Sequence, residues 1–227
     1  MQADLAGLMK SKITYGWLIA AIFLEVISGI SMGTTSGGVA QGLSYFIYIW
    51  SMLVIGLTAS AVASESGEFA DSIMSKSVKR YDYILAKFSS RICYVMIVYF
   101  VITAILVALS LRAPDNHYEI YGLSSSILFV ALALIMLTSI GVALSTVFSN
   151  AVMPIVILLI LWYSMTFFFP LIDPSLNLLS PSHLVGQLPN IIQGIYNGEE
   201  WITAVGFASI SAAAIASATI YFSEKDL

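Results

Sequence analysis

The stretch SESGEFADSIMSKSVKRYDYILAKFSSR, residues 64–91, interrupts a chain that is otherwise strongly apolar. Nine of the chain's 22 charged residues lie in it: Glu65, Glu68, Asp71, Lys76, Lys79, Arg80, Asp82, Lys87 and Arg91. Of all 227 residues, 59% are hydrophobic and 10% are charged, whereas a soluble domain carries about 25% charged residues. We therefore expect an integral membrane protein whose charged stretch lies outside the lipid.

Six apolar runs flank this stretch, and a helix needs about 20 apolar residues to cross a membrane. We predict spans at about 13–32, 41–63, 88–111 and 121–148, a fifth that follows Asn150 and ends at Phe169, and a sixth at 201–222. Pro154 lies near the start of the fifth span, where proline is tolerated. The sequence thus predicts an all-α membrane protein, in which residues 1–227 form a single transmembrane domain.

Residues 171–200 separate the fifth span from the sixth and contain three prolines, Pro174, Pro181 and Pro189. One continuous membrane-spanning helix is therefore not expected here, although leucine and isoleucine recur throughout. Ser180 directly before Pro181 is typical of a helix N-cap followed by proline in the first turn. The segment is predicted to form short helical pieces.

An even number of spans puts both termini on one side of the membrane, and lysine and arginine indicate which side faces the cytoplasm. Eight basic residues fall on the side of the termini: Lys10, Lys12, Lys76, Lys79, Arg80, Lys87, Arg91 and Lys225. Only Arg112 falls on the other side. We predict a multi-pass protein of the cell membrane with both termini in the cytoplasm and residues 171–200 facing outward.

The sequence contains little that suggests catalysis. A phosphate-binding loop requires a glycine directly before its lysine, and no lysine in this chain follows a glycine. No Ser/His/Asp or Cys/His arrangement suggests a catalytic site. His117, His183 and Cys93 make a poor basis for a metal site. We therefore expect no enzymatic activity and no metal in this chain.

Within the charged stretch, residues 67–76 have a pattern of their own. Phe69, Ile73 and Met74 fall at helical spacing, with charged residues elsewhere on the turn. This pattern is typical of a short amphipathic helix that lies along a membrane surface. The alternative is a solvated loop that only fixes the topology.

Residues 65–88 also resemble the cytoplasmic segment of ABC-2 type transporter permeases. Eight residues match the pattern of that segment: Glu65, Gly67, Ser75, Val78, Arg80, Ile84, Leu85 and Lys87. Ser77 departs from the pattern, since the family usually has proline there. Three other regions agree with the family: GVALSTVFSNAVMP at 141–154, LSPSHLVGQL at 179–188 and FSEKDL at 222–227.

The resemblance implies a six-helix permease that forms a homodimer or heterodimer in a prokaryotic cell membrane and exports its substrate. Two cytoplasmic P-loop ATPase subunits, which hold ATP and Mg²⁺, would bind the amphipathic segment, called the coupling helix. Residues 171–200 would form outward-facing re-entrant helices, and no nucleic acid is expected as a partner. The residues expected to couple to the ATPase are Glu65, Gly67, Glu68, Phe69, Asp71, Ile73, Arg80 and Lys87.

Glu25 is the candidate functional residue inside a predicted span. An ionisable group within a membrane span is costly, which makes it a functional candidate, although a glutamate bonded to a neighbouring helix can also serve packing alone. One alternative function is a stand-alone or ion-coupled secondary transporter that uses Glu25. Another is a non-transporting membrane anchor of a larger assembly. A neighbouring gene for a P-loop ATPase would favour the ATPase-driven transporter over both.

Overall fold

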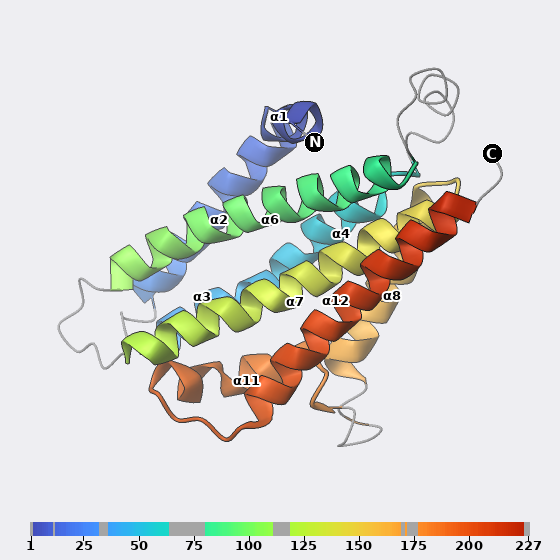
Figure 1. The fold of residues 1–227 in the computed structure, drawn as a ribbon. Helices are drawn as coiled ribbons and strands as arrows, with labels where there is room; N and C mark the ends of the chain where they lie inside the picture. Colours follow the sequence, from blue (N-terminus) through green and yellow to red (C-terminus); the bar gives the residue numbers. More distant parts are fainter. Residues whose placement is uncertain are drawn as a thin grey trace.

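The computed structural model describes residues 2–10, 12–31, 36–63, 80–110, 119–168, 171 and 177–224, and it is shown in Figure 1. Every regular element in these ranges is a helix, which agrees with the predicted all-α class. At one end of the bundle lie the start of α6 (Arg80–Ser110) and the end of α12 (Glu199–Glu224), and α1 (Gln2–Met9) contacts α6 further along that helix. At the other end lie α11 (Pro181–Ile192) and the start of α7 (Ile120–Val147).

Helices occupy all six predicted positions. The first is α2 (Lys12–Ser31), and the second consists of α3 (Ser36–Tyr45), the π-helix η1 (Phe46–Trp50) and α4 (Ser51–Ala59). They are followed by α6, α7, α8 (Val152–Phe167) and α12. Within the described residues, four helices are long and apolar enough to cross a membrane: Gly38–Ala59, Tyr81–Ser110, Ile120–Val147 and Glu199–Glu224. Two apolar segments are shorter, Thr14–Leu24 and Val152–Phe167.

The third helix begins before the apolar span that the sequence predicts. The expected span began near Phe88, whereas α6 begins at Arg80 and continues for 31 residues. No glycine or proline interrupts these residues, and Asp82 lies in the first turn, where a carboxylate interacts favourably with the helix dipole. The last part of the charged stretch therefore belongs to the same helix as the apolar run that follows it.

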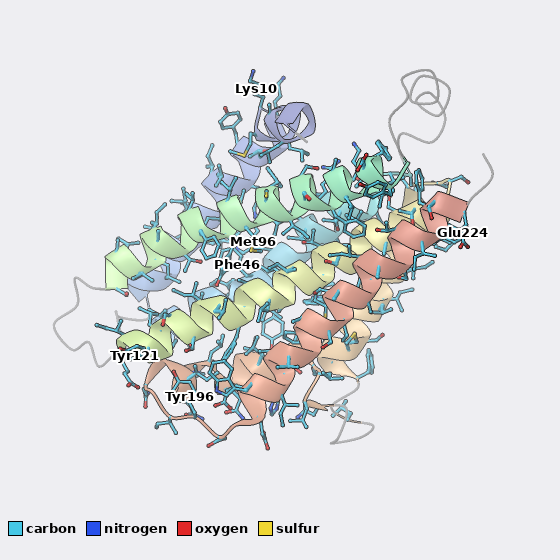
Figure 2. All side chains as sticks on the ribbon, in the orientation of Figure 1. Lys10, Phe46, Met96, Tyr121, Tyr196 and Glu224 are labelled. Atoms are coloured by element: carbon cyan, nitrogen blue, oxygen red, sulfur yellow. The ribbon has the colours of Figure 1, made fainter. Side chains whose placement is uncertain are left out.

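Helix α7 forms the centre of the bundle and contacts α4, α6, α8, α11 and α12. Figure 2 shows Phe46 and Met96 in the middle of the bundle, and Tyr121 and Tyr196 at the end where α7 begins. Phe46 is fully buried, and its ring meets that of Tyr99 edge-on at 4.8 Å between centroids. The second and third helices are thus packed together beside α7.

The π-helix η1 interrupts the regular hydrogen-bond ladder of the second span, and a helix inside lipid must satisfy its backbone groups within the protein. Two side chains of α8 donate to carbonyls of this segment. The Trp162 Nε1–H bonds to the Ile47 oxygen at 3.1 Å, and the Tyr163 hydroxyl bonds to the Tyr48 oxygen at 3.0 Å. These bonds fasten α8 to the second span.

Candidate functional site

Most of the predicted coupling residues lie outside the described part of the chain: Glu65, Gly67, Glu68, Phe69, Asp71 and Ile73. The predicted amphipathic helix at 67–76 also lies there and stays a prediction. Of the other two coupling residues, Arg80 is the first residue of α6, and Lys87 lies two turns further along. Glu25 belongs to α2, and the orientation of its side chain likewise stays a prediction.

The structure describes both points at which the charged stretch joins the bundle. Before the stretch, the chain turns after α4 at residues 61–63. There the Val62 and Ala63 amides both donate to the Ser145 hydroxyl oxygen, at 2.8 Å and 2.9 Å. Ser145 belongs to the last turns of α7 and is only 1% exposed. The chain is therefore fixed to α7 directly before residue 64.

After the stretch, the first turns of α6 pack into the same region. Ile84 and Phe88 are buried in an apolar cluster that also contains Ala61, Val62, Val142 and Ala218. The Tyr83 ring stacks on that of Phe222 in α12, with 5.9 Å between centroids. Both ends of the interval 64–79 are thus held by one cluster, which joins the end of α4 to α6, α7 and α12. We call these contacts the anchor cluster.

Next to the anchor cluster, α4 and α7 approach each other closely at Gly141. A Cβ atom at this position would overlap the Thr58 hydroxyl oxygen, and it would lie 2.9 Å from the Thr58 Cβ and 3.1 Å from the Leu158 Cδ2. Only glycine leaves room for this contact among α4, α7 and α8. The helices around the anchor cluster therefore cannot separate or slide without losing tightly fitted packing.

Two basic residues near the start of the predicted third span are buried in the protein. Lys87 and Arg91 are only 7% and 8% exposed. The Lys87 ammonium lies 5.6 Å from the centroid of the Tyr83 ring, within cation–π range. Neighbouring helices therefore enclose both side chains.

At the opposite end of the bundle, α11 begins as the sequence predicted. Ser180 is the N-cap and its side-chain oxygen accepts from the Ser182 amide at 3.2 Å, with Pro181 in the first turn. The Ser180 hydroxyl also donates to the Met165 carbonyl at 2.8 Å. This bond ties the start of α11 to the end of α8. The buried face of α11 includes Leu184 and Leu188, and the helix contacts α3, α7 and α8.

The end of α11 packs directly on the start of α7. The Glu119 amide donates to the Ile192 carbonyl at 3.2 Å. A Cβ atom at Gly122 would overlap the Ile191 carbonyl oxygen and lie 2.8 Å from that of Ile192. Gly194 follows with a φ of 79°, a conformation that favours glycine. This junction closes one end of the bundle with backbone contacts.

Sequence reasoning missed one buried carboxylate, that of Glu200 in the first turn of α12. Glu200 is 1% exposed, and neither of its carboxylate oxygens has a hydrogen-bond partner among the described residues. Its neighbour Glu199 is half exposed and lies 3.3 Å from the His183 Nε2. Helical spacing is the signal that could have found Glu200, because it shares a face with Thr203, Ala204 and Phe207.

Within the described ranges, no group of His, Cys, Asp and Glu residues is placed to hold a metal ion.

A comparison with protein families gives one finding for this chain. The model of a family described as ABC-2 family transporter protein matches residues 29–222. The match therefore extends from the end of α2 almost to the end of α12 and includes the whole charged stretch. No curated protein matches the chain.

Proposed function

Because the chain belongs to the ABC-2 family of transporter proteins and is thus a transmembrane transporter subunit, we propose that it forms the translocation pathway of an exporter driven by a separate ATPase. The ATPase would bind the amphipathic segment 67–76 on the cytoplasmic side and would hold ATP and Mg²⁺ in its own P-loop. The permease chain itself would carry no catalytic residue.

The anchor cluster is the observation that carries this proposal. A partner that pushes on the interval 64–79 meets a chain that is fixed at both ends. One end is held by the two hydrogen bonds to Ser145, and the other by Ile84 and Phe88 in the buried cluster. Displacement of the interval would therefore move α4 and α6 together with α7 and α12. A solvated loop that serves topology alone would not need both ends to be tied to the same core.

The family also supports a proposal for the remaining architecture. All six helical positions would cross the membrane, and two copies of the chain, or this chain and a related one, would enclose the pathway. Helix α11 would be a re-entrant helix that closes the outer end, because it packs its apolar face onto α3 and α7 and does not continue across the bundle.

The proposed topology predicts which side of the membrane is accessible at each end of the chain. A cysteine introduced at Asp226 should react with a membrane-impermeant reagent only after the cells are opened, whereas one at Asn197 should react in intact cells. The native Cys93 is replaced by serine in both variants so that the reagent can label only the introduced thiol. Labelling at Asp226 in intact cells would contradict the cytoplasmic assignment of the termini.

The proposed coupling helix predicts unequal effects of two substitutions. Phe69→Ala should weaken association with the ATPase about 30-fold, because truncating an aromatic anchor at an interface typically costs at least about 2 kcal/mol. Lys76→Ala should change it by less than about threefold, because rim charges influence encounter more than affinity. Both affinities are measured with the purified full-length permease and its co-expressed ATPase. Equal effects of the two substitutions would argue against Phe69 as an anchor.

A further inference from the structure

The second span consists of two α-helical halves that pack mainly against different helices. Helix α4 packs mostly on α7 and α8, whereas α3 packs mostly on α11 and α6 and also contacts α2. The π-helix η1 lies between the two halves. A movement of one half relative to the other would therefore take place at η1, where the regular α-helical ladder is already interrupted.

The two halves are not held equally firmly. Helix α4 fits closely against α7 at Gly141 and Thr58, and the chain directly after it is bonded to Ser145. The side-chain hydrogen bonds described for α3, from Gln41 to the Tyr45 hydroxyl and from Ser44 to the Gln41 carbonyl, stay within that helix. Three of its ten residues are glycine, which has low helix propensity. Helix α3 is thus the half that can move at lower cost.

Two side chains of α8 hold the π-helix in its present geometry. The Trp162 Nε1–H donates to the Ile47 carbonyl at 3.1 Å, and the Tyr163 hydroxyl donates to the Tyr48 carbonyl at 3.0 Å. The Ser51 hydroxyl lies 3.4 Å from the Tyr163 hydroxyl. These contacts come from a neighbouring helix and not from the second span itself, so the geometry of η1 depends on the position of α8.

One polar group of η1 is not satisfied in this geometry. Trp50 is only 5% exposed, and its buried Nε1–H has no hydrogen-bond partner among the described residues. An unpaired buried donor is costly, and such groups need an explanation where they occur. A second conformation of η1 that pairs this N–H would recover that cost, which brings the two conformations closer in free energy.

We propose that η1 is a hinge at which α3 moves relative to α4, and that Trp162 and Tyr163 hold it in the conformation described here. Sharp bends in helices are typically located at π-turns and at a few other kinds of interruption. Movements of this kind switch between discrete arrangements, because packed helices do not deform continuously. The hinge is a property of the single chain and does not depend on the ATPase.

The contact between α3 and α11 is the one that the hinge would open. Helix α11 is fastened separately, at its start by the bond from Ser180 to the Met165 carbonyl of α8 and at its end by the bond from the Glu119 amide to the Ile192 carbonyl. Bending at η1 would therefore move α3 away from a helix that stays in place. The use of this movement to open one end of a transport pathway rests on the proposed function.

Distances between spin labels on the purified full-length chain test the hinge. One label pair joins position 41 of α3 to the exposed position 190 of α11, and Cys93 is replaced by serine. Tyr163→Phe removes one bond to η1 and keeps the ring. It should raise the population of a longer distance at least about threefold, as expected for the loss of one hydrogen bond between membrane helices. A pair that joins position 52 of α4 to position 190 should not change.

The matched control is Thr166→Val in the next turn of α8. The Thr166 hydroxyl is buried and donates only to the Trp162 carbonyl of its own helix, at 2.8 Å. Its removal leaves both bonds to η1 in place and should keep the wild-type distances. Trp162→Phe removes the other bond and should raise the same population as Tyr163→Phe.

Three results would overturn the hinge. In the first, Tyr163→Phe leaves the distance between positions 41 and 190 as in the wild-type chain. In the second, Thr166→Val changes that distance as much as Tyr163→Phe does. In the third, the distance between positions 52 and 190 changes equally, which would mean general loosening of the bundle. If Trp162→Phe does not fold, Tyr163→Phe and its control decide the test. Because no ATPase is present, failure of the hinge leaves the proposed function standing.

Discussion

Replacing Ser145 by alanine should strongly destabilise the end of the bundle that contains the anchor cluster. The Ser145 hydroxyl oxygen accepts from the Val62 and Ala63 amides in a buried site. Removing the acceptor of a buried donor costs about 1–3 kcal/mol for each donor, since no water replaces it. The expected result is a large drop in the thermal unfolding midpoint in detergent, together with faster proteolysis around residue 64.

The matched control for Ser145→Ala is its neighbour in α7. Thr146 is also buried, but its hydroxyl donates only to the Ala143 carbonyl of its own helix, at 2.7 Å. Thr146→Val removes a hydroxyl from the same turn without releasing any amide of residues 62 and 63, so its effect should be much smaller. If Ser145→Ala is no more destabilising than Thr146→Val, Ser145 does not hold the start of the charged stretch.

Gly122→Ala should disrupt the opposite end of the bundle. The added methyl group would overlap the Ile191 carbonyl oxygen, which is a backbone atom that cannot rotate away. Overpacking of this kind typically costs about 1–3 kcal/mol and shifts the backbone. The end of α11 should therefore move off α7, with loss of the hydrogen bond from the Glu119 amide to the Ile192 carbonyl.

The same substitution at Gly186 of α11 is the control, because a Cβ atom there would meet nothing within 4 Å. Gly186→Ala should leave stability unchanged or raise it slightly, since alanine lowers the conformational entropy of the unfolded chain. Hydrogen exchange of the amides of α11 should increase in Gly122→Ala and not in Gly186→Ala. Equal exchange in the two variants would mean that α11 is not held by its contact with α7.

Periodicity and local capping rules predicted the regular elements well. The fourth predicted span, 121–148, coincides within a residue with α7, and the Ser180 cap was predicted from two adjacent residues. Helix α6 begins at Arg80, eight residues before the span predicted from Phe88, because a helix can continue beyond the apolar run through residues that contain no glycine or proline. Local patterns therefore predicted which segments are helical more reliably than they predicted where each helix begins and ends.

Features that depend on contacts between distant segments could not be predicted. The hydrogen bonds from the Val62 and Ala63 amides to the Ser145 hydroxyl oxygen join positions more than 80 residues apart. The burial of Arg91 and Glu200 also depends on which helices pack around them. From the sequence alone, both charged side chains are expected at a surface, that of Arg91 on the side of the termini and that of Glu200 on the opposite side. The π-helix at Phe46–Trp50 has no local sequence signal, and the donors from α8 that meet its carbonyls lie 115 residues away.

The central claim is that residues 67–76 bind a cytoplasmic ATPase and transmit its movement through the anchor cluster. Cysteines placed at Glu68 and Ser72 test this claim most directly, by crosslinking to the ATPase co-purified with the full-length permease. We expect at least one of the two positions to crosslink, with a yield that changes between nucleotide-free and ATP-bound states. The account would be contradicted if neither position crosslinks in any nucleotide state and the ATPase stays bound after residues 67–76 are replaced by a polar linker.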